Sequence, residues 1–272
     1  MNQETRDLIK NNDLDRYLIS LIAGKKAYAL MALLAVDAEL SKIVAHHSDA
    51  MLGQIKLTWW REALEEAYET PDKTRQHPTL QFFKKHIIED KQINLKASDL
   101  DPFIDGRITL IEDATAIIDY AASTSGTLFK LWQTIEKPDS DEESLITANK
   151  VGIRWGLYRT LKAIQFQILQ QQGQLEPQTL VSLGIPEKDL FKGEGDLEAN
   201  TSNFVEALVN QTKHDITKNS PQICNAVKLA NYHCENKLGL LAANNHILSD
   251  TIFDQTVFKT LINLWWANLT KI

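Results

Sequence analysis

The run GIRWGLYRTLKAI at residues 152–164 decides the fold class, because two glycines four residues apart interrupt a sequence of helical character. The surrounding pattern predicts a helix from about Ser144 to Gln171, with Gly152 and Gly156 in its middle. A glycine in a helix interior costs about 1 kcal/mol relative to alanine, so close packing against another helix is the expected reason for both. The run therefore indicates a protein whose helices pack tightly against one another.

The rest of the chain continues this helical pattern. Only 11 Gly and 7 Pro occur among 272 residues, while Ala, Leu, Lys, Glu and Gln are abundant, which favours helices over strands. Apolar spacing and capping residues predict further helices at about residues 13–24, 25–46, 49–69, 78–89, 98–120, 196–218, 221–243 and 251–269. Ser123 to Gly126 predict a kink or a close helix approach, and residues 173–195 a loop. We expect an all-α fold in a single domain over residues 1–272.

Charge and cysteine content restrict the class of protein. A net charge of −7 without a basic stripe argues against a nucleic-acid surface. No run approaches the roughly 20 apolar residues of a membrane span, and the polar N-terminal stretch resembles neither a signal nor a transit peptide. Cys224 and Cys234 lie ten residues apart in one predicted helix, roughly 15 Å along its axis, so they cannot pair within it. We expect a bacterial cytoplasmic protein, with peripheral membrane contact possible, or a mitochondrial matrix protein in a eukaryote.

Four runs carry a resemblance to a known family. They are GQIKLTWWREALEEAY from Gly53, HPTL from His77, YAASTSGTLFKL from Tyr120 and GIRWGLYRTLKAI from Gly152. In this order and spacing they resemble the squalene/phytoene synthase family, over most of the chain up to about residue 192. The resemblance implies an isoprenoid-synthase-type helical bundle around a central cavity. It also implies two aspartate-rich motifs on facing helices, which in that family bind magnesium and the diphosphates of two prenyl substrates.

The chain departs from the family at those motifs. Set against the family, Ser41 and Ala45 occupy the expected aspartate positions of the first motif, and Ala163 and Gln167 those of the second. Arg159 replaces a usual asparagine. None of the four substitutes is a carboxylate that could ligate magnesium.

Nearby charges do not restore the lost motifs. Lys42, Arg159 and Lys162 make both neighbourhoods basic, which disfavours a bound metal ion. Asp37 and Glu39 are two residues apart and point about 200° away from each other around a helix, so they are a poor metal pair. A subgroup that includes alphaproteobacterial proteins and the mitochondrial complex I assembly factor of this ancestry also lacks the acids. The implied role is assembly of respiratory NADH:ubiquinone oxidoreductase (complex I).

Eight residues are candidates for a binding site, and each also has a purely structural explanation. Ligand or anion binding is assigned to Arg61, Arg154, Arg159 and Lys162, and lining of the cavity to Ser41, Trp59, Ala163 and Gln167. Packing between helices explains the tryptophan equally well, and a solvated helix face explains the cations. His46, His47, His77 and His233 lack the spacing of a helical zinc site, and no nucleophile motif occurs, so we expect no metal site and no catalytic residue.

The sequence therefore predicts a non-catalytic protein that needs no cofactor. Its cavity or its outer surface would bind an apolar isoprenoid-like ligand or a protein partner during assembly of the respiratory complex. The alternative is a transferase of prenyl groups, in which basic side chains neutralise the diphosphates and magnesium is retained as a cofactor. A third reading is a generic helical scaffold, which large side chains filling the cavity would favour. Trp265 and Trp266 could meet a membrane or a partner, or pack in the core.

Overall fold

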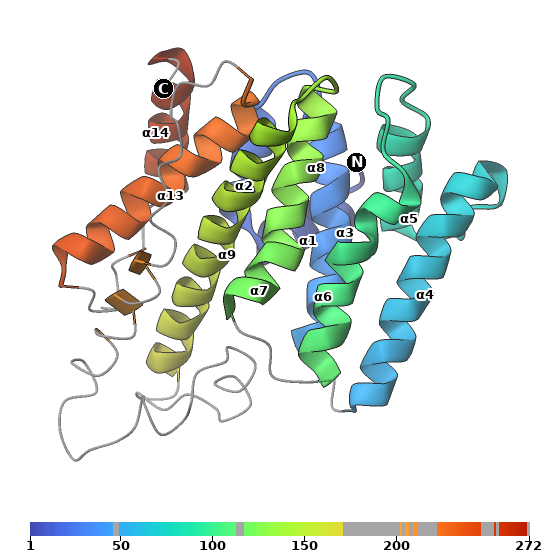
Figure 1. Cartoon of the computed structure of the whole chain (residues 1–272), viewed down its shortest axis with the longest axis horizontal. Helices are drawn as coiled ribbons and strands as arrows, with labels where there is room; N and C mark the ends of the chain where they lie inside the picture. Colours follow the sequence, from blue (N-terminus) through green and yellow to red (C-terminus); the bar gives the residue numbers. More distant parts are fainter. Residues whose placement is uncertain are drawn as a thin grey trace.

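The computed structural model describes residues 1–45, 49–112, 117–170, 222–245, 253 and 256–270 and positions 202, 205, 206, 209 and 210, with backbone only for 164–170. Every regular element in these residues is helical, which confirms the all-α prediction (Figure 1). The α-helices are α1 (Gln3–Asn12), α2 (Leu14–Ile22), α3 (Ala27–Ala45), α4 (Ala50–Glu69), α5 (Pro78–Phe83), α6 (Asp101–Glu112), α7 (Ile117–Ala121), α8 (Thr127–Glu136), α9 (Glu142–Gln170), α13 (Asn225–Ala243) and α14 (Val257–Thr270). The short elements are η1 (Pro71–Lys73), η2 (Lys84–Ile88), η3 (Ala97–Leu100) and η4 (Ala122–Gly126).

Capping residues explain where several helices begin. Asp13 accepts a hydrogen bond from the backbone of Arg16 at the start of α2, and Asp49 accepts one from the backbone of Met51 at the start of α4, so both helices begin where the sequence predicts. Helix α1 was not predicted from the sequence pattern. Asn2 caps that helix, and burial of Leu8 and Ile9 stabilises it. The predicted loop at 173–195 and most of the predicted helix at 196–218 fall outside the described residues.

The two glycines of α9 lie against η4 and the end of α7, as close packing requires. A Cβ atom on Gly152 would lie 2.4 Å from the carbonyl oxygen of Ser125 and 2.6 Å from the Cα of Gly126. A Cβ atom on Gly156 would lie 2.7 Å from the Cβ of Ala121. The run of small residues that predicted a kink forms η4, a π-helical turn between α7 and α8. The predicted reason for the glycines is confirmed.

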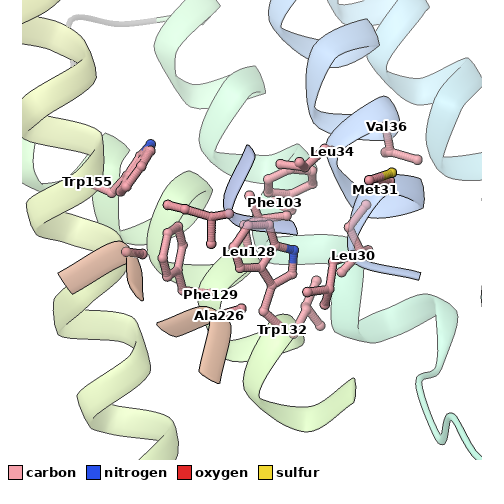
Figure 2. Packing of buried hydrophobic residues seen from close by; sticks show 14 of the residues in the cluster. Leu30, Met31, Leu34, Val36, Phe103, Leu128, Phe129, Trp132, Trp155 and Ala226 are labelled. Atoms are coloured by element: carbon pink, nitrogen blue, oxygen red, sulfur yellow. The ribbon is translucent and has the colours of Figure 1, made fainter. Parts of the chain in front are cut away.

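Aromatic side chains fill the interior between α3, α6, α8 and α9 (Figure 2). The rings of Phe129 and Trp132 of α8 pack at a tilt with their centroids 5.1 Å apart, and the ring of Trp155 of α9 lies 5.8 Å from that of Phe129. Phe103 of α6 packs into the same cluster. This core fixes α9 and α3, the two helices that carry the positions of the lost acidic motifs. In the part of the chain that the structure describes, no helix is long and apolar enough to cross a membrane.

Candidate functional site

A buried carboxylate on α3 lies at the centre of the candidate site. Asp37 is 2% exposed and accepts hydrogen bonds from Arg16 of α2 and Arg107 of α6. Arg159 of α9 approaches the same carboxylate, with its Nη1 3.4 Å from Oδ2. Burial alone would raise the pKa of Asp37, but the charges of the three arginines outweigh burial and hold that pKa well below its usual range. Asp37 is therefore ionised, and its ion pairs link α3 to α2, α6 and α9.

A second carboxylate extends this network. Asp13 accepts a hydrogen bond from Nε of Arg16 at 2.7 Å and one from the indole nitrogen of Trp155 at 3.0 Å. Nε of Arg159 lies 3.3 Å from the same carboxylate. Together with Asp37 and Arg107, these groups form what we call the arginine–aspartate network. Its three guanidinium groups face two carboxylates, so the network carries one excess positive charge.

A separate group of polar contacts surrounds Asp15 on α2. Its Oδ2 lies 2.8 Å from the hydroxyl of Tyr158, 3.2 Å from Nζ of Lys162 and 3.5 Å from Nε2 of His233. Burial would raise the pKa of Asp15, but the neighbouring His233 and Lys162 prevail and lower it. This group ties α2 to α9 and α13 and uses Lys162, a candidate for ligand binding, in an internal ion pair.

The network lies one helical turn from the positions of the lost acids. Asp37 precedes Ser41 by four residues, and Arg159 precedes Ala163 by four residues, so each pair shares a helix face. Nη2 of Arg107 lies 3.3 Å from the hydroxyl of Ser41. An ion pair between Asp37 and Arg159 therefore connects α3 to α9 beside the expected motif positions.

Two cavities open beside the network. The larger, of about 540 Å³, lies among α1, α3 and the start of α5, and its lining includes Glu4, Lys42 and His77. The smaller, of about 230 Å³, lies among α3, α6, α7, η4 and α9. Ser41, Ala45 and Arg159 line both. Ala163 lines the smaller one, whose lining residues include two arginines and no carboxylate.

The structure brings together some of the predicted site residues and separates others. Ser41, Arg159 and Ala163 share the smaller cavity, as the sequence predicts. Arg61 pairs instead with Asp101 and Asp105 at the surface between α4 and α6.

The remaining predicted residues lie in other contacts. Arg154 is buried against α13, with its Nη1 2.8 Å from the side-chain oxygen of Asn231. Trp59 packs on Arg75 and is not among the residues that line the two cavities. The side chain of Gln167 lies outside the described residues.

Comparison with known proteins places the chain in a family. The family model for squalene/phytoene synthase matches residues 9–229, which is most of the chain. The chain belongs to the squalene/phytoene synthase family. It is also 24% identical over 197 residues to a mouse (Mus musculus) protein named NADH dehydrogenase (ubiquinone) complex I, assembly factor 6. That match covers 70% of this chain and 57% of the mouse protein, so the chain spans little more than half the length of this relative.

The site does not fit the magnesium ions that the squalene/phytoene synthase family implies. Magnesium prefers carboxylate and other oxygen ligands, but Ala45 and Ala163 offer none on the facing helices. Asp37, one helical turn before Ser41, already contacts three guanidinium groups. Among the described residues, no group of three or more His, Cys, Asp or Glu side chains could hold a metal ion. We therefore derive no metal-dependent step at this site.

Proposed function

We propose that this chain is a non-catalytic member of the squalene/phytoene synthase family that acts in the assembly of respiratory NADH:ubiquinone oxidoreductase. The observation that carries the first half of the proposal is the arginine–aspartate network. Its internal ion pairs join α3 and α9 one helical turn from the positions where the family would hold metal and diphosphate. These ion pairs within the chain hold α3 and α9 together at this end of the bundle.

The chemistry of prenyl transfer supports the same view. Ionising an allylic diphosphate places negative charge on the leaving group, and bound metal ions supply much of the stabilisation in metal-dependent catalysis. The network offers one excess positive charge, and only Arg159 of its three arginines is partly exposed. Its other guanidinium groups are held by Asp13 and Asp37. In the alternative function, a prenyl transferase would bind the diphosphate with basic side chains. The network leaves little unpaired positive charge for that purpose.

The assembly role rests on the mouse relative, which is named as an assembly factor of complex I. We propose that the partner is a protein, either a subunit of the complex or another factor acting on it. The protein then acts next to the membrane that holds the complex, on the side of the bacterial cytoplasm or of the mitochondrial matrix. An apolar ligand fits the site less well than a protein partner does, because the larger cavity is of ligand size but carries charged groups such as Glu4 and Lys42 in its lining.

The assembly half of the proposal can be tested in cells of the source organism. Deletion of the gene should lower both NADH:ubiquinone oxidoreductase activity and the amount of fully assembled complex on native gels. Re-expression of the chain should restore both. Unchanged levels of assembled complex in the deletion strain would contradict the assembly role.

The non-catalytic half needs purified protein and a variant that keeps the fold. Lys42→Ala removes an exposed cation from the lining of the larger cavity and touches no buried ion pair. We expect no magnesium-dependent turnover of farnesyl or geranylgeranyl diphosphate by the wild type, and full support of complex assembly by Lys42→Ala. Turnover that Lys42→Ala reduces would establish the transferase alternative instead.

A further inference from the structure

Helix α14 exposes most of its large apolar side chains and buries mainly small ones. The residues that it buries against the bundle are Thr260, Leu264 and Ala267, two of which are small. Most of its larger apolar residues are exposed instead, although α14 contacts α13 and α2. Figure 1 shows α14 at the edge of the molecule. Packing against the described residues of the chain therefore does not explain the most apolar face of this helix.

The outward residues form one continuous stripe. Phe258 is 72% exposed, Trp265 57%, Trp266 60% and Leu269 56%, and Ile262 lies between them at 48%. At 100° per residue these five positions fall within an arc of about 100°, and the three buried residues lie on the opposite side. A soluble protein seldom exposes a contiguous apolar surface of this kind without a binding role.

The charge around the stripe points to one type of surface. The chain as a whole carries a net charge of −7, yet residues 256–272 contain two lysines, Lys259 and Lys271, and no acidic residue. Lys259 follows Phe258 and lies about 100° from it around the helix, at the edge of the stripe. A lysine there can place its stem on apolar surface and its ammonium group among anionic headgroups. Two adjacent tryptophans suit the boundary between lipid and water.

Length and position support the same assignment. The 14 residues of α14 span about 21 Å, too short to cross a hydrocarbon core of about 30 Å but suited to lying along its surface. The helix also lies beyond residues 9–229, the part that matches the family model. Its exposed stripe therefore has no explanation in the chemistry of the prenyl cavity.

We propose that α14 binds the surface of an anionic phospholipid bilayer, with Phe258, Trp265 and Trp266 embedded at the level of the headgroups. The helix lies in the plane of the membrane, and α13 and α2 hold it against the rest of the bundle. This inference rests on α14 alone. It can fail while the proposed assembly function stands, and the reverse also holds.

Vesicle binding by the full chain tests the proposal. The wild type should cosediment with vesicles of mixed phosphatidylcholine and phosphatidylglycerol more strongly than with phosphatidylcholine alone. The variant Phe258→Ser/Trp266→Ser should weaken partitioning by about tenfold or more, because it removes two of the most exposed apolar side chains of the stripe. The matched control is Met51→Ser/Ile55→Ser on α4, which removes two side chains of similar exposure, 68% and 55%, and should leave partitioning unchanged.

A fluorescence measurement keeps the test independent of whether the serine variant folds. Brominated phospholipids should quench the tryptophan emission of the bound wild type. Trp265→Phe/Trp266→Phe should still bind, because phenylalanine keeps the stripe apolar, but should lose most of that quenching. Absence of vesicle binding, equal loss in the α4 control, or quenching that survives in the phenylalanine variant would each overturn the assignment. Absence of vesicle binding would favour a protein partner for the stripe.

Discussion

Replacing Asp37 with asparagine removes one negative charge from the arginine–aspartate network and nearly preserves the shape of the side chain. Among the carboxylates of the described residues, Arg107 pairs with Asp37 alone, whereas Arg16 keeps Asp13. After the substitution Arg107 retains the backbone oxygen of Phe103, 2.6 Å away, and no negatively charged partner. Asp37→Asn therefore creates one uncompensated buried guanidinium group.

The expected cost is large because neither partner can reach water. Asp37 is 2% exposed and Arg107 is 1% exposed. Breaking a buried ion pair by removing one partner typically costs about 3–5 kcal/mol. For a domain of this size a loss of that order lowers the melting temperature by about 10 °C. Total stabilities of folded domains are about 5–15 kcal/mol, so the variant should fold but should lose a large part of its free energy of unfolding.

Urea denaturation monitored by circular dichroism measures this difference. The matched control is Glu39→Gln, a partly exposed carboxylate two residues away on the same helix, which should cost less than about 1 kcal/mol. In Asp37→Asn/Arg107→Met the stranded charge is gone, so the double variant should be more stable than the sum of the two single effects predicts, by more than about 1 kcal/mol. A cost below 1 kcal/mol for Asp37→Asn, or strict additivity with Arg107→Met, would show that the network does not hold these helices together.

The pH dependence of the same variant has a defined sign. The arginines hold the pKa of Asp37 in the folded protein below its value in the unfolded chain. Its stabilising contribution is therefore complete above the unfolded pKa and is lost as pH falls below about 4. The difference in unfolding free energy between the wild type and Asp37→Asn should shrink between pH 7 and pH 3.

Three further predictions concern other parts of the chain. Gly152→Ala should destabilise by about 3 kcal/mol or more, because its Cβ would meet backbone atoms of η4. The control Gly239→Ala in α13 has open space around it and should stabilise by up to about 1 kcal/mol, both read from thermal melts. Burial raises the pKa of Glu136 to about 7, so the folded state binds more protons there than the unfolded chain, and stability falls as pH rises from about 4.5 to 7. In Glu136→Gln the free energy of unfolding should lose this decline, and an unchanged decline would contradict the assignment. Removal of divalent cations with EDTA should leave the melting temperature unchanged, because a native metal ion would otherwise stabilise the fold by mass action.

Much of the fold could be predicted because local signals and packing agree. The caps Asp13 and Asp49, the glycines of α9 and the small residues of η4 are all visible as patterns in the sequence. The helix α1 was missed because its sequence is polar except for Leu8 and Ile9. Its stability comes from contacts with α3 and α2, which a local pattern does not contain.

The site was harder to predict, because ion pairs depend on distances between residues far apart in the chain. Through the family resemblance the sequence places Arg159 and Ser41 near each other, but it gives no role to Asp37, because Asp37 and Glu39 point about 200° apart around their helix and make a poor metal pair. One signal was available. Asp37 continues the buried stripe of Leu30 and Leu34 at three- and seven-residue spacing, so a charge there needs a buried partner. Arg107 could not be named as that partner, since 70 residues separate the two.

The network also suggests how a member of this family can keep its fold without the acidic motifs. Four carboxylates facing each other across α3 and α9 would repel one another unless cations lay between them. In this chain two of those positions carry Ala45 and Ala163, and the ion pair between Asp37 and Arg159 joins the two helices one turn away. An attraction within the chain then replaces one that depends on bound metal and substrate. In the proposed non-catalytic function, α3 and α9 then need no bound metal or substrate to pack against each other.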